Sequence, residues 1–114
     1  MKIFKKRDSA FIGSIMGLSG EYAEAIFRLD DNEIVTIGRD PKTSQIVMDE
    51  SCERVSRTHC SIAVNGANGT YTVCDRSSNG TFLNGERIAF GEPVEAPRGS
   101  ILAVGDRSNP FRLN

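Results

Sequence analysis

The chain has 114 residues, in which 14 lysines and arginines stand against 15 acids for a net charge of -1. Nucleic-acid-binding proteins and proteins held at membranes by basic residues need an excess of positive charge, so this balance argues against both classes. With 39% hydrophobic and 25% charged residues, the composition is that of a folded soluble domain and not of a disordered tail.

Residues 1–10 are predicted to be a basic, flexible leader, and residues 11–114 to form a single domain. A basic start followed by the apolar residues 10–18 is also the pattern of a secretory signal peptide. Two glycines and a serine interrupt those apolar residues, and cleavage at the Ala-x-Ala pattern of residues 23–25 would remove a predicted strand. We therefore expect a cytoplasmic protein, and no stretch approaches the roughly 20 apolar residues of a membrane span.

Short runs rich in β-branched residues alternate with turn residues along the rest of the chain. They predict strands over residues 14–18, 25–29, 34–37, 45–48, 61–64, 71–74 and 101–104. Alanines and glutamates make a helix over residues 20–29 the competing interpretation, but turn residues at both ends of this segment favour a strand. Pro93, Pro97 and Pro110 are expected near strand ends or on edge strands, where a missing N–H is tolerated.

Asn-Gly pairs are the most frequent turn signal in this sequence. Because both residues tolerate positive φ, Asn-Gly is the strongest short-range indication of a β-hairpin. The four pairs lie at residues 65–66, 68–69, 79–80 and 84–85. Short strands separated by such turns indicate an all-β sandwich or barrel.

The three cysteines, Cys52, Cys60 and Cys74, are an odd number and include no Cys-x-x-Cys pair. A disulfide framework normally uses an even number, and a zinc site needs closer ligand spacing. We therefore expect reduced thiols, as in a cytoplasmic protein, and neither a metal nor another cofactor.

Three polar clusters lie in predicted loops. Gly38-Arg39-Asp40-Pro41 follows one predicted strand, Ser56-Arg57-Thr58-His59 precedes another, and the polar segment 75–85 follows a third. Together they offer guanidinium groups, hydroxyls, side-chain amides and the accessible backbone N–H groups of glycine-rich turns. These groups suit a tetrahedral dianion, because arginine donates two hydrogen bonds at once while hydroxyls and amides bind the remaining oxygens.

The order and spacing of these clusters resemble the forkhead-associated (FHA) domain family, from about Met16 to the end of the chain. The family pattern is Gly-Arg, Ser-Arg-x-His, Ser-x-Asn-Gly-Thr and then Asn-Gly. The matching segments here are Gly38-Arg39, Ser56-Arg57-Thr58-His59, Ser77-Ser78-Asn79-Gly80-Thr81 and Asn84-Gly85. The resemblance implies an FHA-type β-sandwich of about eleven mostly antiparallel strands, which binds phosphothreonine peptides through loops at one apex.

The resemblance also implies a role for each matching position. Arg39 and the Ser56 hydroxyl would contact the phosphate, and Arg57 would add a contact or border it. Ser78 would contact the phosphate or the adjacent backbone, and Asn79 would hold the main chain of the ligand. Scaffold positions that shape the loops would be Gly38, His59, Gly80, Thr81, Asn84 and Gly85. The alternative role for Arg39 and Ser56 is a structural ion pair or a turn cap.

Arg54 lies two residues before Ser56, in a loop that in this family often reads ligand side chains beyond the phosphothreonine. We predict that it favours an acidic residue three positions downstream of the phosphothreonine. The nearby acids could instead pair with Arg54 and cancel its charge; these are Asp49, Glu50 and Glu53.

The sequence therefore predicts a non-catalytic signalling module that recognises a threonine-phosphorylated protein or peptide and so mediates phosphorylation-dependent protein–protein interaction. It predicts no nucleic-acid partner and no insertion into a membrane. The alternative is an FHA-fold interaction module that binds an unphosphorylated partner, which would not need Arg39, Ser56 and Asn79 together. An enzyme is not expected, because His59 is the single histidine and no nucleotide or metal motif accompanies it.

Overall fold

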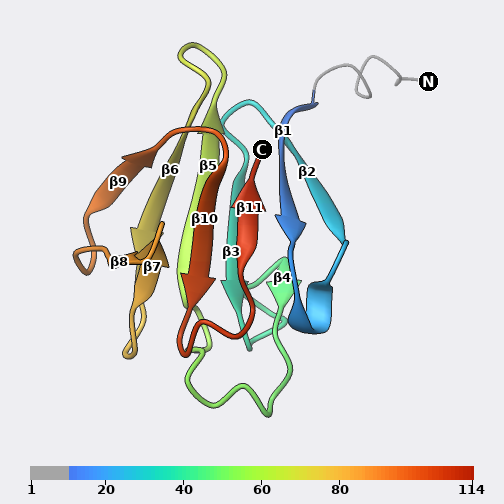
Figure 1. The fold of residues 1–114 in the computed structure, drawn as a ribbon, viewed down its shortest axis with the longest axis vertical. Helices are drawn as coiled ribbons and strands as arrows, with labels where there is room; N and C mark the ends of the chain where they lie inside the picture. The colour runs from blue at the N-terminus through green and yellow to red at the C-terminus, as the bar shows by residue number, and fades with distance from the viewer. Residues whose placement is uncertain (1–10) are drawn as a thin grey trace.

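The computed structural model describes residues 11–114, and the leader predicted over residues 1–10 lies outside the described residues. Within the described part the chain forms eleven strands and one short 3-10 turn, η1 (Figure 1). In chain order they are β1 (Phe11–Gly17), η1 (Gly20–Tyr22), β2 (Ile26–Asp30), β3 (Ile34–Gly38), β4 (Ile46–Val47), β5 (Cys60–Asn65), β6 (Thr70–Asp75), β7 (Thr81–Leu83), β8 (Glu86–Arg87), β9 (Pro93–Ala96), β10 (Ser100–Val104) and β11 (Phe111–Leu113).

The strands form two sheets. One has six strands in the order β2-β1-β11-β10-β7-β8, and the other has five in the order β4-β3-β5-β6-β9. Neighbouring strands in both sheets are antiparallel, except for the parallel pair β3 and β4. The predicted all-β sandwich of about eleven mostly antiparallel strands is confirmed. Within residues 11–114, no helix has the length and apolar character needed to cross a membrane.

The segment before β2 shows why the competing helix does not form. Its first residues make only the 3-10 turn η1, and the chain then doubles back so that Gly17 exchanges backbone hydrogen bonds with Glu24 and Ala25. A Cβ on Gly17 would lie 1.8 Å from the carbonyl oxygen of Tyr22, so this reversal needs glycine there. Pairing with β1 therefore overrides the helix preference of the local sequence, and β2 begins one residue later than predicted.

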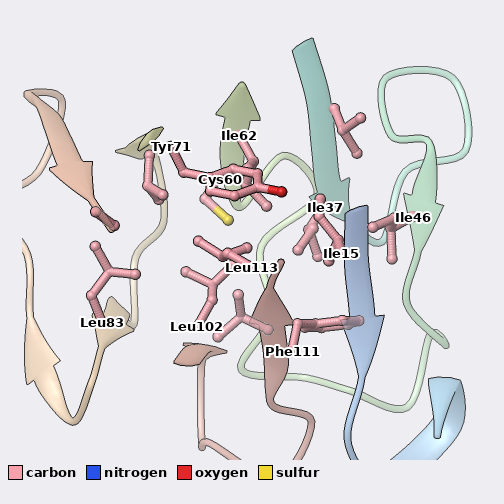
Figure 2. Close-up of a cluster of buried hydrophobic side chains, with 14 of the residues drawn as sticks. Ile15, Ile37, Ile46, Cys60, Ile62, Tyr71, Leu83, Leu102, Phe111 and Leu113 are labelled. Carbon is pink, nitrogen blue, oxygen red and sulfur yellow. The ribbon is translucent and has the colours of Figure 1, made fainter. Parts of the chain in front are cut away.

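The core lies between the two sheets, and the alternation along β5 and β6 supplies much of it. Every second residue of β5 is buried, beginning at Cys60, and β6 continues the pattern with Tyr71 and Val73. Figure 2 shows these side chains meeting those of β1, β10 and β11 from the other sheet. The Tyr71 hydroxyl donates to the carbonyl of Ser14 and accepts from its N–H, so one buried side chain joins both sheets.

The turns place four loops at one end of the sandwich. Figure 1 shows the β3–β4, β4–β5, β6–β7 and β10–β11 loops at its lower end, with the β5–β6 hairpin and Asn114 at the other. The Asn84-Gly85 pair forms the predicted two-residue hairpin turn between β7 and β8, with φ of 53° and 88°. Pro93 begins the edge strand β9, as expected for a residue that lacks an N–H.

Candidate functional site

Most of the predicted site residues gather where these loops meet. We use the name loop cluster for residues 39–45, 48–59, 76–80 and 105–110. The β3–β4 and β4–β5 loops are joined by two backbone hydrogen bonds of 3.1 Å, from Arg39 to Ser56 and from Asp40 to Arg57. A Cβ on Gly38 would lie 2.0 Å from the carbonyl oxygen of Arg57, so the two loops can approach this closely only if residue 38 is glycine.

His59 links the β4–β5 loop to the β6–β7 loop from inside the protein. Its Nδ1 accepts a hydrogen bond of 2.9 Å from the backbone N–H of Ser56, so the ring proton is on Nε2. Nε2 donates to the carbonyl oxygen of Gly80 at 2.8 Å. Burial lowers the pKa of His59, which outweighs the raising effects of the Gly80 hydrogen bond and the Asp75 charge. The imidazole is therefore neutral near pH 7 and holds two loops in register.

Asp75 fixes the turn that follows β6. One of its carboxylate oxygens accepts from the N–H and hydroxyl of Ser77 at 3.0 and 2.6 Å, and from the hydroxyl of Thr81 at 2.7 Å. The Ser77 hydroxyl in turn accepts from the N–H of Gly80. Burial raises the pKa of Asp75, but the hydrogen bonds from Ser77 and Thr81 more than offset it and leave the pKa below its usual value.

The Ser56 hydroxyl and the two residues after Ser77 lie at the junction of the loops. The backbone N–H of Ser78 donates to the Ser56 oxygen at 3.1 Å, which leaves the hydroxyl proton of Ser56 free to donate to a ligand. The Asn79 side chain donates to the carbonyl oxygen of Arg54 at 3.0 Å. One N–H and the carbonyl oxygen of the Asn79 amide are therefore still available for the main chain of a bound peptide.

Arg39 is the half-buried cation of the loop cluster. Its Nε–H donates to the carbonyl oxygen of Val55, and its Nη1 lies 3.4 Å from a carboxylate oxygen of Glu50. The other guanidinium donors have no partner within residues 11–114. Arg39 is thus fixed at one edge while its remaining donors stay available to an anion.

Arg54 and Arg57 differ from Arg39 because both side chains are exposed and take part in no hydrogen bond or ion pair in the described part of the chain. The acids considered as partners of Arg54 do not pair with it, and Glu50 pairs with Arg39 instead. Hydrogen bonds from Ser108 lower the pKa of Asp106, and the charge of Arg54 adds to this effect.

The structure therefore brings together most of the positions singled out from the sequence. The residues that meet in or directly behind the loop cluster are Gly38, Arg39, Arg54, Ser56, Arg57, His59, Ser78, Asn79, Gly80 and Thr81. Asn84 and Gly85 lie apart from it, in the β7–β8 turn.

Sequence reasoning missed three contributions to this site. They are the pairing of Glu50 with Arg39, the contact of Arg39 with the Val55 carbonyl, and the hydrogen bond of 2.9 Å between the hydroxyls of Thr43 and Thr58. All three depend on contacts between loops, for which the sequence carries no spacing signal. Asp75 was recognisable in principle, because Asp followed two residues later by Ser is the pattern of a side-chain-capped turn.

The thiols and the metal-binding side chains complete the inventory of reactive groups. None of the three cysteines, all of which lie in residues 11–114, forms a disulfide, and burial raises the pKa of Cys60 to about 12. The same residues contain no group of three or more His, Cys, Asp or Glu side chains placed to hold a metal ion.

Comparison with known proteins agrees with this geometry. The family model of the FHA domain matches residues 35–105. "Probable serine/threonine-protein kinase fhkA" of Dictyostelium discoideum is 35% identical over 115 residues, which cover 94% of this chain and 19% of that protein. The chain thus spans about a fifth of the length of this curated relative.

Solved structures of similar fold extend the comparison. The FHA domain of the CT664 protein from Chlamydia trachomatis has a TM-score of 0.73 and 27% identity, covering 89% of this chain and 94% of that one. The N-terminal FHA domain of S. cerevisiae Rad53p, solved with a phosphothreonine peptide, has a TM-score of 0.68 and 20% identity, covering 89% and 90%. The MEK1 FHA domain with a HOP1 phosphothreonine peptide has a TM-score of 0.70 and 18% identity, covering 90% and 95%. The chain therefore belongs to the family of FHA domains, which are interaction modules and generally non-catalytic.

Proposed function

We propose that this FHA domain binds threonine-phosphorylated proteins through the loop cluster, with Arg39 and Ser56 as the groups that contact the phosphate. The observation that carries the proposal is their arrangement. Arg39 is fixed at Nε and keeps terminal N–H donors beyond the one that contacts Glu50. The Ser56 oxygen accepts from the N–H of Ser78, and its own proton has no acceptor within residues 11–114. A phosphate needs such a set of donors, one of them charged.

The binding free energy expected from these contacts fits a reversible signalling interaction. Hydrogen bonds to a charged group contribute about 1.5–3 kcal/mol each. A few of them on exposed loops, less the cost of ordering the peptide, give a binding free energy of about -8 kcal/mol, which corresponds to micromolar affinity. Arg57 would add an exposed charge, the Ser78 hydroxyl a further donor, and the Asn79 amide two hydrogen bonds to the extended peptide. The phosphothreonine peptides bound to the Rad53p and MEK1 FHA domains support the same use of the fold.

Titration calorimetry with three versions of one peptide tests this function. We expect micromolar binding of the phosphothreonine peptide, weaker binding of the phosphoserine peptide, and none of the unmodified peptide. Arg39→Ala should lower the affinity at least tenfold, the low end of a charged hydrogen bond. Arg112→Ala, which removes the same charge from an exposed position of β11, should leave the affinity unchanged.

Two results would contradict the proposal. Equal affinity for the phosphorylated and unmodified peptides would favour the phosphate-independent module. Unchanged affinity in Arg39→Ala, with thermal unfolding showing an intact domain, would remove Arg39 from the phosphate site.

Arg54 is proposed as the residue that selects the ligand sequence. Its exposed, unpaired side chain favours an acidic residue three positions downstream of the phosphothreonine, although Asp106 competes for the same charge. An oriented phosphothreonine peptide library should show enrichment of Asp and Glu at that position, and Arg54→Gln should abolish the enrichment. A library with no acidic preference in the wild-type domain would contradict this role.

A further inference from the structure

Glu50 lies on the guanidinium that we assign to the phosphate. Its carboxylate oxygen is 3.4 Å from Nη1 of Arg39, and this is the one ion pair within residues 11–114. The Arg39 side chain is 23% exposed and that of Glu50 is 74% exposed. The Glu50 side chain makes no second hydrogen bond in the described residues, so it can leave Arg39 without breaking any other contact.

The contact with Glu50 affects how Arg39 can bind an anion, because only some of the guanidinium donors remain for a ligand. A guanidinium binds an anion with two parallel hydrogen bonds when two of its nitrogens are free along one edge. Because Nε already donates to Val55, the edge left for a ligand is formed by the two terminal nitrogens. Glu50 holds one of these, Nη1. Because Nη1 carries two hydrogens, a phosphate on both terminal nitrogens either displaces Glu50 or lies against its carboxylate, and the repulsion between the two anions favours displacement.

We propose that Glu50 is an internal competitor that holds Arg39 in the free domain, is displaced by the phosphate, and thereby sets the affinity for the ligand. This inference rests on the proposed function. Displacement is favourable because a phosphothreonine brings a charge of about -1.5 to -2 and three acceptor oxygens, whereas Glu50 brings one negative charge at a long distance.

The neighbouring acids of the same loop do not share this position. Asp49 accepts hydrogen bonds from the N–H and hydroxyl of Ser51, which hold it in its own turn. Glu53 is exposed, and its side chain makes no hydrogen bond or ion pair in the part of the chain that the structure describes. Glu53 therefore provides a matched control, since its replacement removes the same charge from the same loop without touching Arg39.

The test compares Glu50→Gln with Glu53→Gln. An exposed ion pair changes an equilibrium by about 1.5- to 5-fold, so Glu50→Gln should tighten the Kd of a phosphothreonine peptide by about two- to fivefold at low salt. The gain should appear in the association rate, measured by stopped-flow fluorescence, because the competitor acts on the free domain. Glu53→Gln should show a smaller gain, and high salt should reduce both.

A measurement without ligand completes the design. In the free domain, NMR should show faster exchange of the Arg39 guanidinium protons with water in Glu50→Gln than in the wild type or Glu53→Gln. Weaker peptide binding by Glu50→Gln would overturn the inference and make Glu50 a residue that positions Arg39. An equal gain in affinity in Glu50→Gln and Glu53→Gln would also overturn the inference, because it would show that only the net charge of the loop affects binding. Absence of binding by the wild type and by Glu50→Gln would overturn the proposed function and the competitor with it.

Discussion

His59 is the residue on which the geometry of the loop cluster depends most directly. Its unprotonated Nδ1 accepts the N–H of Ser56, while Nε2 donates to Gly80. A protonated imidazole would place a second N–H against that of Ser56, so only the neutral ring fits. Burial, which lowers the pKa of His59, acts in the same direction.

The stability of the domain should therefore depend on pH through His59. The unfolded chain takes up a proton near the ordinary histidine pKa of 6.5, whereas the folded domain does so only at lower pH. The contribution of His59 to the free energy of unfolding should be constant above about pH 6.5 and fall below it, with a slope of at most about 1.4 kcal/mol per pH unit. The loss should level off below the folded pKa. Urea denaturation between pH 5 and 8 measures the slope.

Because His59 is the single histidine of the sequence, its replacement gives a clean control. His59→Gln should be less stable at pH 7.5 and should lose the slope between pH 5 and 6.5. A slope that persists in the variant would assign the effect to other groups. Asp75 titrates separately, because its pKa lies below the ordinary value of 3.8 and its contribution is lost only in stronger acid.

Individual residues also show how far the sequence could predict the site. The residue types of Arg39, Ser56 and Asn79 indicated an anion site, and their order, through the resemblance to the FHA family, implied which loops would form it. The ion-pair partner of Glu50 could not be predicted from residue types and their order. Sequence proximity suggested Arg54, but the fold brings Arg39, eleven positions earlier, within reach of its carboxylate.

At the scale of elements, the end of β3 determines how closely the β3–β4 and β4–β5 loops approach. Gly38→Ala would force a Cβ against the carbonyl oxygen of Arg57, and overpacking of this kind costs about 1–3 kcal/mol. Separation of the loops should also weaken the hydrogen bonds that orient Arg39 and Ser56. We therefore expect both a lower free energy of unfolding and at least a severalfold loss of phosphopeptide affinity.

Gly99→Ala is the matched control for this substitution. Gly99 has a φ of +90° and open space around its missing Cβ, so alanine should cost about 1–2 kcal/mol through backbone strain alone. Its turn precedes β10 and lies outside the loop cluster, so phosphopeptide affinity should stay at the wild-type value. Chemical denaturation and calorimetry on both variants measure the two effects. Equal affinity losses would show that Gly38 acts only through stability.

The length of each element explains which strands could be predicted. The strands predicted over residues 61–64 and 71–74 are β5 and β6, each one residue longer at both ends, because six alternating residues give a clear pattern. The strands β7, β8, β9 and β11 have two to four residues, too few to show alternation. β7, β9 and β11 pair with strands distant in the sequence, which the family resemblance implied and periodicity could not show. β8 pairs only with β7, across the Asn84-Gly85 turn.

At the scale of the whole molecule, a net charge of -1 conceals arginines in the loop cluster that have no acidic partner in the described residues. Arg54 and Arg57 are exposed in the loop cluster and unpaired within residues 11–114, whereas Arg39 is half-buried. Exposed charges are screened by salt much more than buried ones. The affinity for a phosphothreonine peptide should therefore fall severalfold between low and high salt without disappearing.

The variant Arg57→Ala separates the contribution of an exposed arginine to the affinity from that of the half-buried Arg39. It should lose about 1.5- to 5-fold in affinity at low salt and almost nothing at high salt, because an exposed charge acts only when it is unscreened. Calorimetric titrations at several salt concentrations measure the dependence. A loss that stays constant across salt concentrations would instead indicate that Arg57 makes a direct, buried contact with the phosphate.

The last described residue of the chain lies at the end of the sandwich opposite the loop cluster. Asn114 and the start of β1 lie near the β5–β6 hairpin, at the end remote from the loop cluster (Figure 1). A fluorophore, solid support or fusion partner joined at Asn114 would therefore leave the loops facing solution. On the proposed function, a domain coupled in this way would capture phosphothreonine peptides with its loop cluster unobstructed by the attachment.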